Sequence, residues 1–305
     1  MSIQLTILGC HSATPRNNAH PTAQFLEINE RHFLIDCGEG TQTLLRKNKI
    51  QFAKIRHIFI SHLHGDHFYG LIGLISTFGL LNREHDLHIY GPKGIKEIIT
   101  LQLKLCKSWT KFSLIFHELN SPESMVVFED KKVIVRTIPL DHRIYTNGYL
   151  FQEKEGSRKL NMEKIKLNSE IQVCDYHHLK KGKNFIAPDG TEIPNEKLTL
   201  PPKKTISYAF CSDTAFLPSM VPTLTKIDLL YHEATFLETE KELAKKTKHS
   251  TAKEAATIAK EAQVGQLIIG HYSNRYKDLD LFQKEAAGIF PNTHLAKTGK
   301  IFSID

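Results

Sequence analysis

The sequence SHLHGDH, residues 61–67, decides how this chain of 305 residues is interpreted. It follows directly on a strand-like run at residues 57–60. In extended chain the first two histidines of the cluster point the same way, whereas Asp66 and His67 can turn toward a second point. Imidazole and carboxylate groups suit zinc or a related divalent ion. The cluster therefore predicts a metal site; the alternative is a set of polar loop residues at the start of a helix.

One segment is too short to surround two metal ions, so further ligands must come from elsewhere in the chain. Three candidates each follow an apolar run: His142, Asp213 and His271. A β-rich scaffold would deliver such residues from rigid strand ends into one crevice. Each by itself is equally well a satisfied surface residue, and only together with residues 61–67 do they predict a single metal centre.

Strand-like and helical patterns alternate along the chain. In the first half, strand-like runs lie at residues 3–8, 24–28, 32–36, 57–60 and 87–90. Two helical patterns lie at residues 40–48 and 94–105. In the second half, strand-like runs lie at 126–128, 132–138, 148–152, 205–210, 229–232 and 266–270. A capping box formed by Thr251 and Glu254 begins the best helix of this half. Two such cycles predict an α/β protein with two sheets packed face to face and helices outside.

The periodicity fails between residues 153 and 203. This stretch is polar and rich in lysine, and it contains the turn sequence PDG at 188–190 and a Pro-Pro pair at 201–202. A structureless connection of this length is uncommon in a compact domain and is usually functional or a small projecting element. We therefore expect one domain, residues 1–305, with an inserted flexible arm at 153–203; a tolerated surface loop is the alternative.

Composition limits the function classes. With 41% hydrophobic residues the chain is long enough to bury a large core, which excludes disorder as its main state. A net charge of +7 favours acidic partners such as nucleic acid without requiring them. The five cysteines are scattered and odd in number, which fits a reducing cytoplasm. No apolar run reaches the roughly twenty residues of a membrane span, so we expect no membrane partner.

The chain resembles the ribonuclease Z family of the metallo-β-lactamase fold in motifs spread over nearly its whole length. Besides SHLHGDH, these are LG followed by SATP at 8–15, DCGEGTQ at 36–42, HEAT at 232–235, HST at 249–251 and GHYSNRY at 270–276. The resemblance implies a four-layer αββα sandwich. It also implies a zinc-dependent endoribonuclease that removes the 3′ trailer of precursor tRNA, leaving a 3′-hydroxyl on the tRNA and a 5′-phosphate on the trailer.

The same resemblance implies a two-zinc centre. One ion would have three ligands: His62, His64 and His142. The other would also have three: Asp66, His67 and His271. Asp213 would bridge the two ions, and manganese or cobalt would suit the same donors. Asp66 would also orient or deprotonate the attacking water, and Asp36 would hydrogen-bond the second nitrogen of a ligand histidine.

Further residues resemble family positions that meet the RNA. His249, with Glu233 as its orienting partner, would contact the scissile phosphate and protonate the leaving oxygen; the alternative is structural hydrogen bonding around the start of the helix at Thr251. Arg275 and Tyr276 would bind nucleotides beside the cut, or form a solvated turn.

The arm departs from the family pattern, since the Gly-Pro pair usual at its tip is missing between residues 171 and 183. Three lysines, Lys180, Lys181 and Lys183, would still contact tRNA phosphates by charge, or would keep a loop soluble. The resemblance also implies a homodimer.

Two other function classes stand beside this one. The first is a hydrolase of a small ester, thioester or phosphodiester on the same fold, which fold-level analogy cannot separate from the nuclease. The second is a metal-dependent RNA-binding or scaffold protein whose hydrolytic centre is dead. The complete ligand set argues against the second class, because a decayed site is expected to lose at least one ligand.

Overall fold

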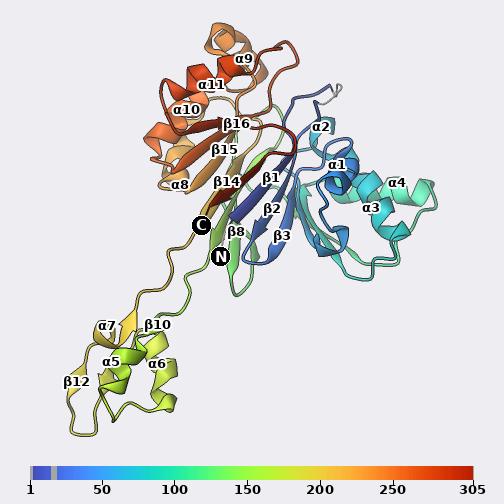
Figure 1. Ribbon diagram of the computed structural model, residues 1–305. Coiled ribbons are helices and arrows are strands. Elements are labelled where there is room, and N and C mark those ends of the chain that lie inside the picture. Colours follow the sequence, from blue (N-terminus) through green and yellow to red (C-terminus); the bar gives the residue numbers. More distant parts are fainter. Residues whose placement is uncertain (1–2, 15–18, 305) are drawn as a thin grey trace. The chain divides into compact units, whose positions relative to one another are not determined.

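The computed structural model describes residues 3–14 and 19–304, and it contains two seven-stranded sheets (Figure 1). Pro15 of the SATP motif lies outside the described residues. The first sheet has the strand order β18-β1-β2-β3-β4-β5-β6. Its strands are β1 (Ile3–Gly9), β2 (Ala23–Ile28), β3 (Arg31–Ile35), β4 (His57–Phe59), β5 (Leu87–Pro92), β6 (Leu114–Leu119) and β18 (Ile301–Ile304).

The second sheet has the order β17-β16-β15-β14-β9-β8-β7. Its strands are β7 (Val126–Glu129), β8 (Val133–Pro139), β9 (Asn147–Glu153), β14 (Ser207–Cys211), β15 (Leu229–Glu233), β16 (Gln266–Gly270) and β17 (Thr293–Leu295). Both sheets are mixed: β3 to β6 are parallel in the first, and β14 to β17 in the second.

Parallel pairing places the chemistry-bearing residues at common edges. In the first sheet Ile35 pairs with Phe59, so Asp36 and residues 61–67 leave the sheet at the same end. In the second sheet Cys211 pairs with His232, and His232 with Ile269. The residues that follow these strands therefore emerge together, as the carboxyl ends of parallel strands do.

Apolar side chains fill the space between the sheets and beneath the helices. Aromatic residues dominate the layer between the two sheets, with Phe33 and Phe59 facing Phe151 at ring-centroid distances of 5.3 Å. A second cluster packs three helices against the outer face of the first sheet: α1 (Thr41–Lys47), α3 (Gly70–Leu80) and α4 (Ile95–Leu105). Two helices cover the outer face of the second sheet: α10 (Ala252–Glu261) and α11 (Asp280–Ala287). The expected αββα sandwich is confirmed.

The remaining helices of this unit are short. They are η1 (Phe52–Lys54), α2 (Gly65–Phe68), η3 (Pro218–Met220), α8 (Val221–Leu224), η4 (Glu238–Glu240) and α9 (Lys241–Thr247). The capping box at the start of α10 forms as expected, with Thr251 Oγ1 accepting from the Glu254 N–H and Glu254 Oε2 accepting from the Thr251 N–H. Elements that sequence periodicity left out are β6, β17, β18, α3, α9 and α11.

Residues Glu153–Thr205 form a compact unit of their own. Two short strand pairs, β10 (Lys159–Leu160) with β13 (Thr199–Leu200) and β11 (Phe185–Ile186) with β12 (Glu192–Ile193), accompany short helices. The helices are α5 (Met162–Lys166), η2 (Val173–Asp175), α6 (Tyr176–Lys180) and α7 (Asn195–Leu198). Ile165, Leu179 and Leu198 belong to its small apolar core. The buried Asn195 amide donates to the backbone oxygens of Leu179 and Lys183, which ties the segment together. The stretch without sequence periodicity is thus locally folded.

Within residues 3–14 and 19–304, no helix is long and apolar enough to cross a bilayer. All five cysteines are free thiols.

Candidate metal centre

The residues of the centre lie in the loops after strands and, for Asp66 and His67, on the short helix α2. Residues 61–67 follow β4, His142 follows β8, Asp213 follows β14 and His271 follows β16. The structure brings all seven expected ligands into two adjoining groups, and the ligand atoms within each group lie within 4.8 Å of one another.

The first ligand group consists of His62, His64 and His142. His64 Nδ1 lies 3.0 Å from His62 Nε2 and 3.3 Å from His142 Nε2. His62 and His142 are buried, whereas His64 is partly exposed. Three imidazole nitrogens that face one point supply three of the four positions of a tetrahedral site, which leaves one for a carboxylate.

The second ligand group consists of Asp66, His67 and His271. Asp66 Oδ2 lies 3.5 Å from the Nε2 atoms of both histidines. The same carboxylate oxygen accepts a hydrogen bond of 2.8 Å from the Ala13 N–H, which fixes its direction.

Asp213 stands between the two groups. Its Oδ2 lies 3.5 Å from His62 Nε2 and 3.9 Å from His142 Nε2, on the side of the first group. Its Oδ1 lies 3.4 Å from His67 Nε2 and 3.2 Å from His271 Nε2, on the side of the second. One carboxylate therefore offers one oxygen to each group.

Several buried polar atoms of the centre have no hydrogen-bond partner in the part of the chain that the structure describes, and they indicate whether metal ions fit this site. His67 Nε2, His271 Nε2 and Asp213 Oδ1 are buried and have no hydrogen-bond partner among the described residues. Buried polar atoms are normally hydrogen-bonded, and here three of them face one another. A cation between them would satisfy all three. The two ligand groups are thus consistent with a binuclear metal site.

Electrostatics favours a cation in the same place. Burial lowers the pKa of His67, but the carboxylates of Asp213, Asp66 and Asp36 outweigh it and hold that pKa well above its ordinary value. Burial raises the pKa of Asp213, and the neighbouring histidines reverse this and hold it well below its ordinary value. The carboxylates therefore stay charged and attract positive charge to the centre.

Hydrogen bonds to the outer nitrogens hold the ligand rings in position. Asp36, which is fully buried, accepts from His67 Nδ1 at 2.7 Å. The Lys248 backbone oxygen accepts from His142 Nδ1 at 2.8 Å, and Thr235 Oγ1 lies 2.9 Å from His271 Nδ1. Such partners orient a ring and leave its other nitrogen for a metal.

Sequence reasoning identified the role of Asp36 but missed the roles of Ser61 and Thr235. Ser61 donates its N–H to Asp36 Oδ1 at 2.7 Å, and its hydroxyl lies 2.9 Å from Asp36 Oδ2. Thr235, within the HEAT motif, links His271 to Glu233. Serine and threonine are too common for their residue type to mark them, and only their place directly beside motif residues is a signal.

The backbone is strained at two of these positions. Asp36 and His271 have φ of 54° and 64°, which few residues other than glycine adopt. The Asp36 N–H donates to Phe59 O at 2.8 Å, and the His271 N–H donates to Cys10 O at 2.7 Å. These hydrogen bonds to neighbouring strands and loops stabilise the strained conformation. Strain of this kind concentrates at functional sites.

Gly38 explains part of the DCGEGTQ motif. A Cβ atom at this position would lie 2.4 Å from the Asp66 backbone oxygen. Only glycine lets this loop approach the metal cluster so closely.

His249 lies beside the ligand groups with Glu233 behind it. Its Nδ1 is 2.9 Å from Glu233 Oε1, and its ring lies 5.1 Å from that of His142 and 5.4 Å from that of His271. Burial lowers the pKa of His249, but the Glu233 carboxylate more than compensates and raises it to about 9. Glu233 Oε1 also accepts from the backbone N–H groups of Thr214 and Ser250, so it organises the loops as well.

The structure places the other expected RNA-contacting residues in different surroundings. Arg275 lies 5.2 Å above the Phe236 ring and 3.4 Å from Glu240. The Tyr276 hydroxyl accepts from the Leu237 N–H, and its ring packs edge-on against Phe282. The three arm lysines are exposed at the end of α6 and in the turn that follows it, at residues 180, 181 and 183.

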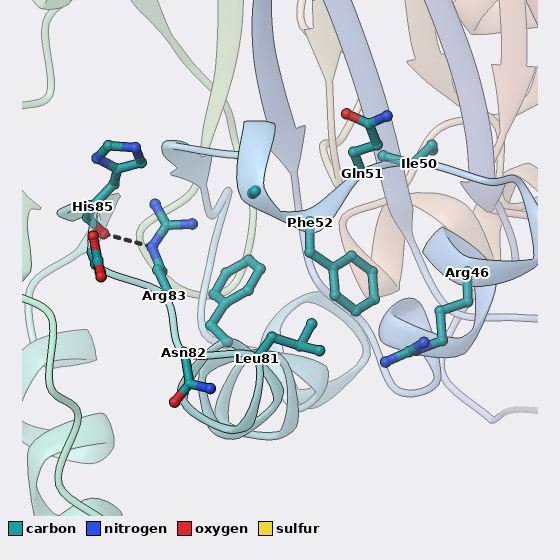
Figure 2. A pocket seen from close by; sticks show the side chains of 11 residues that line it. Arg46, Ile50, Gln51, Phe52, Leu81, Asn82, Arg83 and His85 are labelled. Atoms are coloured by element: carbon teal, nitrogen blue, oxygen red, sulfur yellow. Dashed lines mark hydrogen bonds between the residues drawn. The ribbon is translucent and has the colours of Figure 1, made fainter.

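A separate cavity of about 540 Å³ lies under α3 and η1 and shares no residue with the ligand groups (Figure 2). Arg46 stacks on Phe52, and Arg83 stacks on Phe78 while donating to the His85 backbone oxygen. Its lining mixes apolar residues with arginine, amide and other polar side chains and contains none of the seven expected metal ligands.

Comparison with known proteins agrees with the fold and the centre. The chain is 46% identical to "Ribonuclease Z" of Bacteroides fragilis over 301 residues, which is 99% of both chains. Human tRNase Z, short form, matches with a TM-score of 0.72 and 26% identity, covering 99% of each chain. The metallo-beta-lactamase fold protein YhfI from Bacillus subtilis matches with a TM-score of 0.69 and 19% identity over both full chains.

Fold and centre together define a metallo-β-lactamase-fold protein with a His/Asp metal site. A family model described as "Anti-Pycsar protein Apyc1" matches residues 3–155, which is half of the chain. By this match the chain belongs to that family. Over its full length the chain belongs to the ribonuclease Z family of metal-dependent endoribonucleases. The family expected from the sequence motifs is confirmed.

Proposed function

We propose that this protein removes the 3′ trailer of precursor tRNA by hydrolysis, leaving a 3′-hydroxyl on the tRNA and a 5′-phosphate on the trailer. The observation that carries the proposal is the position of Asp213, whose two oxygens face two separate ligand groups. Two-ion centres suit the in-line displacement of a phosphodiester. Membership of the ribonuclease Z family supports RNA as the substrate.

Zinc is the ion that histidine and carboxylate donors favour, and manganese and cobalt accept the same donors. The first ligand group would hold one ion, the second ligand group the other, and Asp213 would be shared. Two bound ions of this class supply an activated water and positive charge for the phosphate oxygens.

Asp66 would orient the attacking water and take its proton. Its Oδ2 is fixed by the Ala13 N–H and by the nearby histidines, while its side chain remains 13% exposed. A carboxylate that is fixed yet reachable by water suits this role.

His249 would donate a proton to the leaving 3′-oxygen. Glu233 holds its Nδ1, so Nε2 is the nitrogen left for the substrate. The bond to Glu233 favours the protonated ring, which a general acid requires. The alternative, a purely structural role near the start of α10, predicts that removing His249 lowers stability more than turnover.

By the family resemblance, the unit Glu153–Thr205 would bind the tRNA. Its exposed lysines, Lys180, Lys181 and Lys183, would contact phosphates by charge, which gives salt-sensitive binding without base readout. We further propose a homodimer, as the family resemblance implies, and a reducing compartment such as the cytoplasm, which the five free thiols fit.

The central test is cleavage of an end-labelled precursor tRNA by the purified protein, with and without a chelator. We expect one chelator-sensitive cut beside the discriminator nucleotide and two zinc-class ions per chain by elemental analysis. A protein that holds two ions and leaves the tRNA intact would refute the proposal and favour a small ester or thioester as substrate.

The arm is tested by deletion. Gln152 pairs with Ser207 across β9 and β14, so residues 154–205 can be replaced by a two-residue Asn-Gly turn without breaking the sheet. We expect tRNA binding to weaken while hydrolysis of bis-(p-nitrophenyl) phosphate continues. Unchanged tRNA affinity would exclude the arm as a binding site.

A further inference from the structure

A cavity of about 500 Å³ opens beside His249, on the side of α9 and the loop after β14. We call it the lysine pocket; it is lined chiefly by Asp141, Phe216, Lys241, Lys245, Lys248 and His249. Of these six residues only His249 belongs to a family motif. Its volume lies in the range of pockets that hold small molecules.

Two of the three lysines that line the lysine pocket form ion pairs. Lys248 Nζ lies 2.6 Å from Asp141 Oδ1, and Lys241 Nζ lies 3.2 Å from Glu238 and 3.7 Å from Glu254. Lys245 is exposed, and it forms no ion pair with any residue in 3–14 or 19–304. The pocket therefore presents one free ammonium group, which suits a phosphate.

Phe216 supplies a surface of a different kind. Its ring is 38% exposed although it belongs to a loop whose preceding residues, Ser212 to Thr214, are buried. An exposed aromatic ring near unpaired positive charge is the arrangement by which proteins bind single-stranded RNA, with a base on the ring and a phosphate on the lysine.

His249 connects the lysine pocket to the metal centre. One side of the residue lines the pocket, and its ring also lies 5.1 Å and 5.4 Å from the rings of His142 and His271. In the proposed function, His249 meets the leaving 3′-oxygen. That oxygen belongs to the last nucleotide that the tRNA keeps, so this nucleotide must extend from His249 away from the ligand groups.

We propose that the lysine pocket binds the last retained nucleotide of the tRNA, with its base on Phe216 and its 5′-side phosphate on Lys245. This inference rests on the proposed function and adds the site that positions the cut. It assigns roles to two residues outside the family motifs.

The experiment compares Lys245→Ala with Lys246→Ala, a neighbouring exposed lysine on the same helix that does not line the pocket. Substrates are precursor tRNAs with trailers of one and of twelve nucleotides. We expect Lys245→Ala to lower kcat/KM several-fold on both substrates and to reduce the slope of log affinity against log salt by about 0.7. Lys246→Ala should match the wild-type protein in both.

Phe216 is tested in parallel. Phe216→Ala should lower kcat/KM by roughly 5- to 150-fold on both substrates, the range measured for lost base stacking, and Phe216→Trp should restore most of it. Metal content and melting temperature of each variant serve as checks on the fold. A loss in Phe216→Ala that tryptophan fails to rescue would exclude stacking.

The outcomes separate three cases. A defect that appears with the long trailer and disappears with the one-nucleotide trailer would place the trailer in the pocket and overturn this assignment. Equal behaviour of Lys245→Ala and Lys246→Ala would also overturn it. If the wild-type protein cuts neither tRNA, the proposed function itself has failed.

Discussion

The protein has two groups of histidines, and they differ in whether carboxylates face them. The ligand histidines, His62, His64, His67, His142 and His271, surround the carboxylates of Asp66 and Asp213. The stacked histidines, His57, His88 and His117, lie on β4, β5 and β6 and contact one another and aromatic rings. Only four residues of chain, 58–61, separate His57 from the first ligand histidine, His62.

The stacked histidines form a ladder of neutral rings. His88 Nδ1 lies 3.0 Å from His117 Nε2 with the rings nearly parallel, so one ring donates a hydrogen bond to the other. Burial, and secondarily the neighbouring histidines, lower the pKa of His57 to about 4. Imidazoles alone therefore do not make a metal site. Carboxylates that face the same point are needed as well.

The largest effect is expected from removing the shared carboxylate. Asp213→Ala should reduce bound metal below two ions per chain and lower precursor-tRNA cleavage by about 10³-fold or more, since metal catalysis is worth several kcal/mol. His117→Gln, in the stacked group, should keep both ions. Elemental analysis and single-turnover cleavage check this, and a similar loss of metal in both variants would erase the distinction between the groups.

Removing His249 should separate metal binding from proton transfer. His249→Ala is expected to retain both ions but to lower cleavage by about 10²- to 10⁴-fold, the usual contribution of a general acid. The measurement is metal content together with kcat at saturating tRNA. Turnover within a few-fold of wild type would leave His249 with a structural role only.

A smaller effect is expected from the carboxylate behind the ligand ring. Asp36→Asn preserves shape but weakens the bond to His67 Nδ1, and it should cost about 10- to 100-fold in metal affinity or activity. Competition with a fluorescent zinc chelator measures the affinity. Wild-type affinity in this variant would show that Asp36 serves only to bind Ser61.

The smallest effect concerns acid stability and the stacked group. Because the pKa of His57 is lowered in the folded state, the unfolded chain binds an extra proton between about pH 6.5 and 4, and stability falls as pH falls through that window. His57→Phe keeps the ring contacts and removes this proton. The loss of unfolding free energy between pH 8 and pH 5, from urea titrations at saturating metal, should shrink by roughly 2 kcal/mol. An equal loss of unfolding free energy in the wild-type protein and in His57→Phe would contradict this prediction.

Much of the centre could be predicted because its chemistry is local in the sequence. Four of the seven expected ligands stand within residues 61–67, and the other three directly follow apolar strands. The two-sheet fold could be predicted for a similar reason, since short apolar runs such as those of β15 and β16 stand out from the polar residues around them. The family motifs implied the same αββα arrangement that the two cycles of strands and helices had predicted.

The unit Glu153–Thr205 resisted prediction for the opposite reason. Its strands are two residues long and its helices at most five, so no periodic pattern can develop. Its core residues, among them Ile171, Phe185 and Leu198, are irregularly spaced and meet only when the segment folds. The expected flexible arm therefore has a folded core that periodicity could not predict.

The sequence by itself determined which residues bear the chemistry, because histidine and aspartate are common metal ligands and these ones follow strand-like runs. Only the tertiary structure decided how they are shared: which oxygen of Asp213 faces which group, and which partner holds each ring. It also decided that Lys245 and Phe216 meet beside His249. Several of these relations join residues that are far apart in the chain, and such contacts form only once the chain has folded.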